Sequence, residues 1–232
     1  PLPEGIAGGD LASVPDRMNA GVLSKLRTLL AKAKVPYTWE VAEKVLAAGE
    51  KVIIFTGFTA AMKEFEELCD QARVLSVKVD GTTSLTGKSV AAALFQRKTL
   101  DTAQRSFAIK HYGSWFLKLL DRAEYASWTK KELAEATKRF GRDRSTWPHT
   151  VAVFLGQMVS ASEGITLTAA DVLLFNDLDW MPTRHQQAED RIYRLASGGQ
   201  SHDTVYIGYI LSDSWLDDFL LVQLIEKAKE ID

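Results

Sequence analysis

Two arginines near the C-terminal end of the chain share a predicted helical face with a glutamine and an aspartate. In the segment QQAEDRIYR, Gln187, Asp190, Arg191 and Arg194 stand at positions i, i+3, i+4 and i+7, which lie on one side of an α-helix. Guanidinium groups are planar and permanently charged, so such a face is suited to binding phosphate oxygens. The alternative is a solvated face on which Asp190 and Arg194 form an i, i+4 ion pair.

A second phosphate-binding pattern is incomplete. Residues 82–89, TTSLTGKS, nearly match the phosphate-binding loop G-x-x-x-x-G-K-[ST], in which small residues let backbone N–H groups surround the phosphates. Thr82 occupies the first glycine position, and Gly81 comes one residue too early. We therefore favour a turn that leads into a helix. The alternative is a self-sufficient nucleotide-binding enzyme that would use the Gly-Lys-Ser triplet at 87–89.

Gly164 is a third candidate position. It is followed by alternating threonines and apolar residues that lead into an apolar run. A glycine there lets the backbone approach a ligand closely, whereas the structural alternative is a bulged turn. No metal centre is expected, because Cys69 is the only cysteine and the four histidines are scattered along the chain.

Five short apolar runs are the expected strands of a buried sheet. They lie at 51–56, 74–79, 151–155, 172–176 and 204–210. Helices are expected at 17–33, from Thr38 as N-cap to Gly49, at 59–71, 86–96 and 183–195, and after Ser214 with Asp217 in a capping box. The first is expected to bury Val22, Leu26, Leu29 and Leu30. The alternation predicts an α/β fold, with a mostly parallel sheet covered by helices on both faces.

Residues 97–149 interrupt this alternation, and we interpret them as a helical insertion. Apolar residues at i, i+3, i+4, i+7 and i+8 predict one amphipathic helix through Tyr112, Trp115, Phe116, Leu119 and Leu120. Thr129 and Glu132 form a second capping box, and Gly141 suits the end of that helix.

The charge of this insertion differs from that of the rest of the chain. It holds twelve basic and six acidic residues and so carries +6, whereas the remainder carries −8. A basic block in an acidic chain indicates contact with a polyanion, and the aromatic residues among the basic ones would then stack on bases of DNA. The alternative is a small subdomain whose aromatic residues form its own core. Their helical spacing favours this alternative.

Length and composition fit a globular protein with one large domain or two small ones. The 232 residues are 46% hydrophobic and 25% charged, which are ordinary values. No apolar run reaches the roughly 20 residues that span a bilayer. Residues 1–16 are expected to form a flexible N-terminal segment, and residues 17–232 are expected to form the folded lobe. Because the sequence does not begin with methionine, we expect it to be a piece of a longer protein. The expected location is cytoplasmic, or DNA-associated in a nucleoid or nucleus.

Five segments occur in the order and spacing of the second motor lobe of Swi/Snf-like ATP-dependent DNA translocases, in helicase superfamily two. They are KVIIFT (51–56), VDGTTS (79–84), SEGITLTAAD (162–171), DLDWMP (177–182) and QAEDRIYR (187–194). The chain resembles this family over about 50–96 and 151–230. The detail QAEDR is most similar to the annealing-helicase branch.

The resemblance implies a motor of two RecA-like lobes with ATP in the cleft between them. The phosphate-binding loop and the acidic Mg²⁺ motif belong to the first lobe, so ATP and Mg²⁺ are expected to bind mainly outside this chain. Arg191 and Arg194 resemble arginine fingers, which are typically worth ~10³–10⁵ in rate. Gln187, Asp190 and Gly164 would lie beside the nucleotide. The full-length protein would be an ATP-dependent helicase or translocase, and this chain alone is expected to be inactive.

The resemblance also implies contacts with the backbone of double-stranded DNA. The turn DGTTS is similar to the segment that holds one DNA strand, and Thr82, Thr83, Lys88 and Thr166 are the candidate residues. Contacts with phosphates do not depend on base sequence and weaken with salt.

The chain departs from the family pattern at three places. Met158 and Val159 stand where the family often has Thr-Arg, and Met181 replaces the asparagine of Trp-Asn-Pro. The segment LASGGQ after Arg194 is longer than its counterpart by three residues. These departures leave the arginines in place. The alternative function is a non-catalytic module of the same fold that binds DNA or a protein partner.

Overall fold

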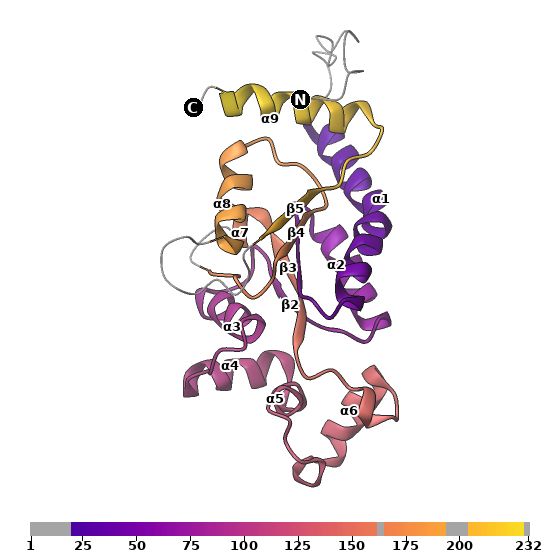
Figure 1. The fold of residues 1–232 in the computed structure, drawn as a ribbon, viewed down its shortest axis with the longest axis vertical. Coiled ribbons are helices and arrows are strands. Elements are labelled where there is room, and N and C mark those ends of the chain that lie inside the picture. The colour runs from indigo at the N-terminus through magenta and orange to yellow at the C-terminus, as the bar shows by residue number, and fades with distance from the viewer. Residues whose placement is uncertain (1–19, 162–164, 194–203, 230–232) are drawn as a thin grey trace.

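The computed structural model describes residues 20–161, 165–193 and 204–229. All five predicted strands are present and form one parallel sheet in the order β2-β3-β1-β4-β5 (Figure 1). The strands are β1 (Val52–Thr56), β2 (Leu75–Val79), β3 (Val151–Gln157), β4 (Val172–Phe175) and β5 (Tyr206–Tyr209). Because all strands run the same way, their carboxyl ends meet at one edge of the sheet.

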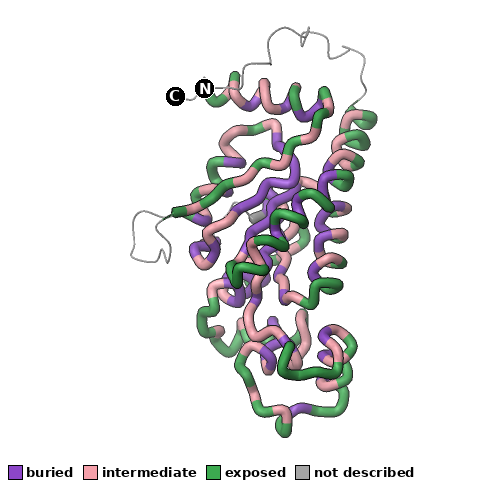
Figure 2. Tube along the Cα trace, turned by 45° about the vertical axis from the view of Figure 1, so that its right-hand side comes forward, coloured by how far each residue is buried: buried purple, intermediate pink, exposed green. Residues whose placement is uncertain are grey.

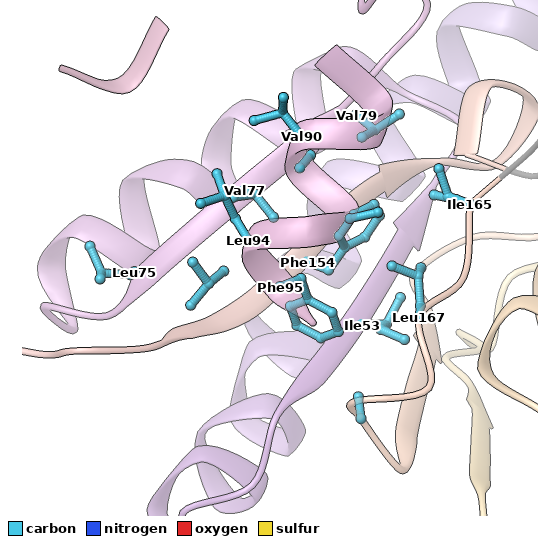
Figure 3. Close-up of a cluster of buried hydrophobic side chains, with 14 of the residues drawn as sticks. Ile53, Leu75, Val77, Val79, Val90, Leu94, Phe95, Phe154, Ile165 and Leu167 are labelled. Carbon is cyan, nitrogen blue, oxygen red and sulfur yellow. The ribbon is translucent and has the colours of Figure 1, made fainter. Parts of the chain in front are cut away.

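Helices cover both faces of this sheet, as predicted. On one face lie α1 (Ala20–Ala47) and α2 (Thr59–Gln71), and on the other lie α3 (Leu85–Phe95) and α8 (Pro182–Ile192). Every residue of β1 is buried, and the central strands form the buried interior of the molecule (Figure 2). Figure 3 shows the cluster between the sheet and α3. The fold class predicted from the alternation of strands and helices is therefore confirmed.

The two helices predicted before β1 form the single helix α1, which corrects the expected break. Pro36 lies inside α1, although proline normally disrupts a helix interior. Thr38 is not an N-cap: its buried hydroxyl lies 3.2 Å from the carbonyl oxygen of Lys34 and 2.7 Å from Oδ1 of Asn176. Burial of the residues around Pro36 against the sheet holds the helix together.

The face that α1 buries also differs from the prediction. Val22, Leu26 and Leu29 are exposed, and only Leu30 of that predicted set is partly buried. The residues that pack on the sheet are Ala31, Val35, Trp39 and Ala42. The apolar spacing was correct for a helix, but several of its positions face away from the core.

The insertion between α3 and β3 is helical and lies at one end of the sheet (Figure 1). It contains α4 (Thr102–Tyr112), α5 (Ser114–Leu120) and α6 (Lys130–Phe140), with short 3₁₀ turns at Tyr125–Ser127 and Arg144–Thr146. The single helix predicted through Tyr112 and Leu120 is broken at Gly113, whose φ of 91° is outside the helical range. The capping box of Thr129 and Glu132 and the helix end at Gly141 are confirmed.

The aromatic residues of the insertion form a core. Among them Phe116, Trp128, Phe140 and Trp147 are buried and join the cluster of the adjacent sheet face. This confirms the alternative in which aromatic spacing reflects packing. These rings are not available to stack on bases.

The last helix, α9 (Trp215–Lys229), is tied to α1 by a buried ion pair. Lys34 Nζ lies 3.0 Å from Oδ2 of Asp217, and both side chains are almost fully buried. Ser214 Oγ accepts from the backbone of Asp217 at 3.3 Å, as predicted. The Asp217 carboxylate binds Lys34 and the backbone N–H of Ser212 instead of completing a capping box. Within the described ranges no helix is long and apolar enough to cross a membrane.

Candidate nucleotide and DNA site

Arg191 lies in the last turn of α8, beside the segment that leads into the start of β4, whereas Thr82, Thr83 and Lys88 follow β2 at the carboxyl edge of the sheet. Ligands of open parallel sheets bind at this edge. The loop after β2 carries Thr82 and Thr83. Thr166 lies between the short helix α7 (Met158–Ala161) and β4, and α8 follows β4. Gly164 lies outside the described residues.

Helix α8 presents Arg191 at the boundary between core and solvent. Ala188 and Ile192 are buried, whereas Gln187 and Asp190 are exposed and Arg191 is half-buried. No ion-pair partner of Arg191 is present among the described residues, and its Nε is buried without a hydrogen-bond partner there. A buried donor without a partner is unfavourable. Arg191 is therefore a candidate for binding an anion.

The predicted four-residue stripe does not extend to Arg194. Helix α8 ends at Ile192, and Tyr193 has an extended backbone with φ −105° and ψ 111°. The helical spacing therefore groups Gln187, Asp190 and Arg191 only, which corrects the helix predicted over 183–195. Arg194 itself, and with it the alternative Asp190–Arg194 ion pair, lies outside the described residues.

The loop before β4 is hydrogen-bonded to α8 and to α3. The backbone N–H of Leu167 donates to the carbonyl oxygen of Arg191 at 2.8 Å. Nε2 of Gln96 donates to the carbonyl oxygen of Thr166 at 2.7 Å. Ile165 and Leu167 are buried beside Phe154 and Ile53 (Figure 3). Thr166 and Arg191 are thus held in adjacent segments, with the Thr166 side chain half-buried.

The turn after β2 is organised by Asp80. Its Oδ1 accepts from the backbone N–H of Thr82 at 2.9 Å and from the hydroxyls of Thr82 and Thr83 at 2.7 and 3.1 Å. Burial alone would raise the pKa of Asp80, but the hydrogen bonds from Thr82 and Thr83 and the charge of Lys78 outweigh burial and lower it. The two threonines therefore direct their hydroxyl protons to a carboxylate. Lys88 is half-buried and lacks an ion-pair partner within the described part of the chain.

The Gly-Lys-Ser triplet lies inside a helix and not in a phosphate-binding loop. Ser84 caps α3, and its Oγ accepts from the N–H of Gly87 at 3.1 Å. The N–H of Lys88 donates to the carbonyl oxygen of Ser84 at 2.8 Å. A Cβ at Gly87 would approach Cγ2 of Thr83 to 2.9 Å, so close packing accounts for the glycine. The predicted turn into a helix is confirmed.

Gln157, at the end of β3, was missed by the sequence analysis. Its Oε1 accepts from the N–H of Gly81 at 2.9 Å, and its Nε2 donates to the carbonyl oxygen of Gly57 at 3.2 Å. One side chain thus links the loops after β1 and β2 across the strand between them. The signal in the sequence was a single polar residue that ends the apolar run VAVFLG.

Asp177 and Asp179, in the segment DLDWMP that follows β4, were given no role of their own by the sequence analysis. Asp177 is buried and accepts from the N–H of Gly57 at 2.8 Å and from the Thr56 hydroxyl at 2.5 Å; its pKa is raised by burial. Asp179 binds Nη1 of Arg184 at 2.8 and 3.0 Å. Arg184 and Arg191 are both on α8, but only Arg184 has an ionic partner in the described structure.

Comparisons with known proteins identify relatives among SWI/SNF-related proteins. No family model matches the chain. A SWI/SNF-related matrix-associated actin-dependent regulator of chromatin subfamily A-like protein 1 from Bos taurus is 23% identical over 86% of this chain and 15% of its own length. The subfamily A containing DEAD/H box 1 homolog from Drosophila melanogaster is 36% identical over 34% of this chain and 9% of its own length. Helicase SWR1 from Debaryomyces hansenii is 34% identical over 40% of this chain and 5% of its own length.

A solved structure has the same fold. The C-terminal part of the Fun30 ATPase domain matches with a TM-score of 0.50 and 16% sequence identity, over 82% of this chain and 44% of that one. The predicted RecA-like fold and the resemblance to the second lobe of Swi/Snf-like motors are confirmed. The chain spans 15% or less of the length of the curated relatives named above.

Proposed function

We propose that this chain, whose curated relatives are SWI/SNF-related helicases, is the second motor lobe of an ATP-dependent DNA translocase. The observation that carries the proposal is Arg191: a half-buried guanidinium group on a helix packed into the core, without an ionic partner among the described residues. A charge held in this way can reach phosphate oxygens that another domain binds. Charge spreads over those oxygens in the transition state of phosphoryl transfer, and a planar cation stabilises it.

In this proposal Arg191 and Arg194 act as arginine fingers, and Gln187, Asp190 and Gly164 lie beside the nucleotide. ATP and Mg²⁺ are held mainly by a first lobe. Within the described residues no three side chains of His, Cys, Asp or Glu are grouped as a metal site, and the proposal assigns no metal ligand to this chain. Mg²⁺ would neutralise phosphate charge when bound, while Arg191 completes the site from the opposite side.

DNA would be held by its backbone along the turn after β2 and the start of α3. Lys88 is the main candidate, because its ammonium group is not neutralised by a described acidic residue. Thr82, Thr83 and Thr166 would contribute weaker contacts, since Asp80 already accepts from the first two. The names of the relatives refer to chromatin. They support a location on DNA and do not support the cytoplasmic location that was expected from the sequence.

The proposal that a first lobe binds ATP and that this chain supplies the arginines is tested by measuring ATP hydrolysis by the 232-residue chain and by the full-length protein. The chain alone should bind ATP weakly and hydrolyse almost none, whereas the full-length protein should be stimulated by duplex DNA. Lys88→Ala in the chain alone should leave the weak ATP binding unchanged. Tight ATP binding that this substitution removes would instead favour a self-sufficient nucleotide-binding enzyme.

The alternative function, a non-catalytic module, gives a different result in the full-length protein. If Arg191→Ala and Arg194→Ala both retained full DNA-stimulated turnover, neither arginine would act on ATP. The chain would then serve to bind DNA or a protein partner.

A further inference from the structure

A polar cavity lies between the end of α3 and the helices α4 and α5 of the insertion, which are neighbours in Figure 1. Its volume is about 300 Å³. Lys88 is near the start of α3, so the cavity lies at the opposite end of that helix from the proposed DNA contacts. The charged residues of its wall are Arg97, Lys98, Arg105 and Asp121, and His149 is also part of the wall.

Positive charge predominates in this wall. Three of its charged residues are cations and one, Asp121, is a carboxylate that is already paired with Arg105. Arg97 and Lys98 have no ion-pair partner in the part of the chain that the structure describes. Nδ1 of His149 donates to a backbone carbonyl oxygen at 2.8 Å, which holds the ring in place. The cavity therefore offers two cations that no carboxylate neutralises.

Lys51, directly before β1, is a further cation close to this group. Its Nζ donates to the carbonyl oxygen of Phe95 and lies 4.8 Å from the centroid of the Phe95 ring. The side chain is half-buried and has no ionic partner among the described residues. Burial, and then the charge of Arg97, lower the pKa of Lys51 to about 8. Because no described carboxylate offsets the repulsion between Lys51 and Arg97, an anion in the cavity would stabilise both charges.

The C-terminal end of α3 would disfavour an anion if its carbonyl groups lacked partners. The carbonyl oxygens of Ala93 and Leu94 accept from the backbone N–H groups of Lys98 and Arg97, at 2.8 and 3.2 Å. The carbonyl oxygen of Phe95 accepts from the lysine ammonium group described above. These hydrogen bonds reduce the negative potential at the helix end, so the side-chain cations determine the charge of the cavity.

We propose that this cavity binds a phosphate group at a site separate from the proposed nucleotide and DNA contacts. The guanidinium group of Arg97 can donate two parallel hydrogen bonds to phosphate oxygens, and the ammonium group of Lys98 adds a point charge. The same group occurs on small phosphate compounds and on the backbone of DNA, and the experiment below separates these two sources. The site would exist whether or not Arg191 acts on ATP.

Inorganic pyrophosphate and a short DNA duplex are the two probes. The 232-residue chain is titrated with each at low ionic strength, because salt screens exposed charges. Binding is followed by NMR through the backbone amide resonances of residues 99–105, so that anions bound elsewhere on the chain do not contribute to the measured affinity. Pyrophosphate should shift these resonances in a saturable way.

Arg97→Gly and Arg73→Gly form a matched pair of variants. Both arginines are exposed, follow a helix and have a φ of 57°, which glycine adopts without strain. Each substitution removes one positive charge, but only Arg97 lines the cavity. Arg97→Gly should weaken pyrophosphate binding about tenfold or more, the usual effect of a charged hydrogen bond. Arg73→Gly should leave the affinity nearly unchanged.

A second pair tests the site by reversal of charge. Lys98→Glu places a carboxylate in the cavity wall and should abolish binding of pyrophosphate, whereas Lys110→Glu, at an exposed position of α4, should not. Both substitutions change only exposed side chains, so this pair remains informative if Arg97→Gly does not fold.

The duplex identifies the source of the phosphate group. If Arg97→Gly weakens duplex binding relative to Arg73→Gly, the group belongs to the DNA backbone; if the two variants bind the duplex equally and differ only for pyrophosphate, it belongs to a small compound. The proposal would be overturned if neither probe shifted the resonances of residues 99–105. Equal binding of both probes within either pair of variants would also overturn it.

Discussion

The helices that carry Lys88 and Arg191 and the helical insertion 97–149 all hold basic groups that could bind a polyanion, yet these groups differ in their surroundings. In the insertion, three of the twelve basic side chains are in ion pairs, and the other nine are exposed to solvent; the pairs are Arg105 with Asp121, Lys118 with Glu132 and Arg139 with Asp70. Lys88, at the start of α3, and Arg191, in the last turn of α8, are half-buried and have no ionic partner among the described residues. Net charge favoured the insertion as the binding region, but the combination of partial burial and no ionic partner distinguishes Lys88 and Arg191 from the exposed cations of the insertion.

The aromatic residues differ in the same way. Those of the insertion fill its core, with Trp115 packed against Phe116 and Phe140 and with Trp147 against Trp128. A binding surface is therefore better judged by half-buried cations that lack partners than by the number of cations or rings.

Removal of the unpaired arginine should affect turnover most. Arg191→Ala in the full-length protein should lower DNA-stimulated ATP hydrolysis by about 10³- to 10⁵-fold, the usual effect of an arginine finger. Arg142→Ala, at an exposed position of the insertion, should leave the rate nearly unchanged. Steady-state hydrolysis at saturating ATP and DNA measures both. A comparable loss in Arg142→Ala would remove the contrast between the regions.

Removal of an aromatic ring should show that the insertion is held by its core. Phe116 is 2% exposed, so Phe116→Ala should lower the free energy of unfolding by about 3–5 kcal/mol through loss of packing and creation of a cavity. Thr82→Ala, at the exposed turn after β2, should change it by about 0.5 kcal/mol or less. Urea unfolding followed by tryptophan fluorescence gives both values. An unchanged stability of Phe116→Ala would mean that its ring is not part of a core.

Two lysines provide a matched test of DNA contact. Lys88→Ala should weaken binding of duplex DNA equally for all sequences and reduce the slope of log affinity against log salt by about 1. Lys118→Ala should leave the slope unchanged, because Lys118 Nζ is already 2.8 Å from Oε2 of Glu132. Fluorescence anisotropy over a salt series measures the slope. The reverse pattern would place the DNA contact in the insertion.

The smallest effect concerns pH. Hydrogen bonds from Lys118 and then Ser114 lower the pKa of Glu132 to about 2, against an ordinary value of 4.5. A carboxylate with a lowered pKa stabilises the fold above 4.5, and this contribution is lost as the pH falls toward 2. Glu132→Gln should therefore be less stable near neutral pH and lose less stability over that interval. Parallel pH dependences of the two proteins, measured by urea unfolding, would contradict this role.

Much of the fold was predictable because its signals are local. The strand run VIIFT is apolar up to its final threonine and is buried at every position, as expected for strands covered on both faces. The capping box at Thr129 needs only residues three apart. The continuous helix through Pro36 was not predictable, because its stability comes from tertiary packing of residues such as Trp39 on the sheet. Gly113 likewise breaks a helix whose apolar spacing continues across it.

The candidate site was predictable by residue type but not by contact. The sequence identified Arg191, and it could not show that Arg184 on the same helix is paired with Asp179. Gln157 joins loops that are far apart in the sequence, so no local pattern indicates its role. The end of α8 at Ile192 depends on the backbone of Tyr193, which the helical spacing of the polar residues did not reveal.

The most direct test of the central claim is the binding of a transition-state analogue to the full-length protein. Mg²⁺-ADP with aluminium fluoride mimics the phosphoryl group in transfer, and such analogues bind more tightly than substrates when the site stabilises the transition state. We predict that Arg191→Ala weakens binding of the analogue by at least about 10²-fold and leaves the affinity for ADP unchanged, whereas Arg184→Ala, which removes the arginine paired with Asp179, weakens neither. Equal affinity of Arg191→Ala and the unmodified protein for the analogue would contradict the account.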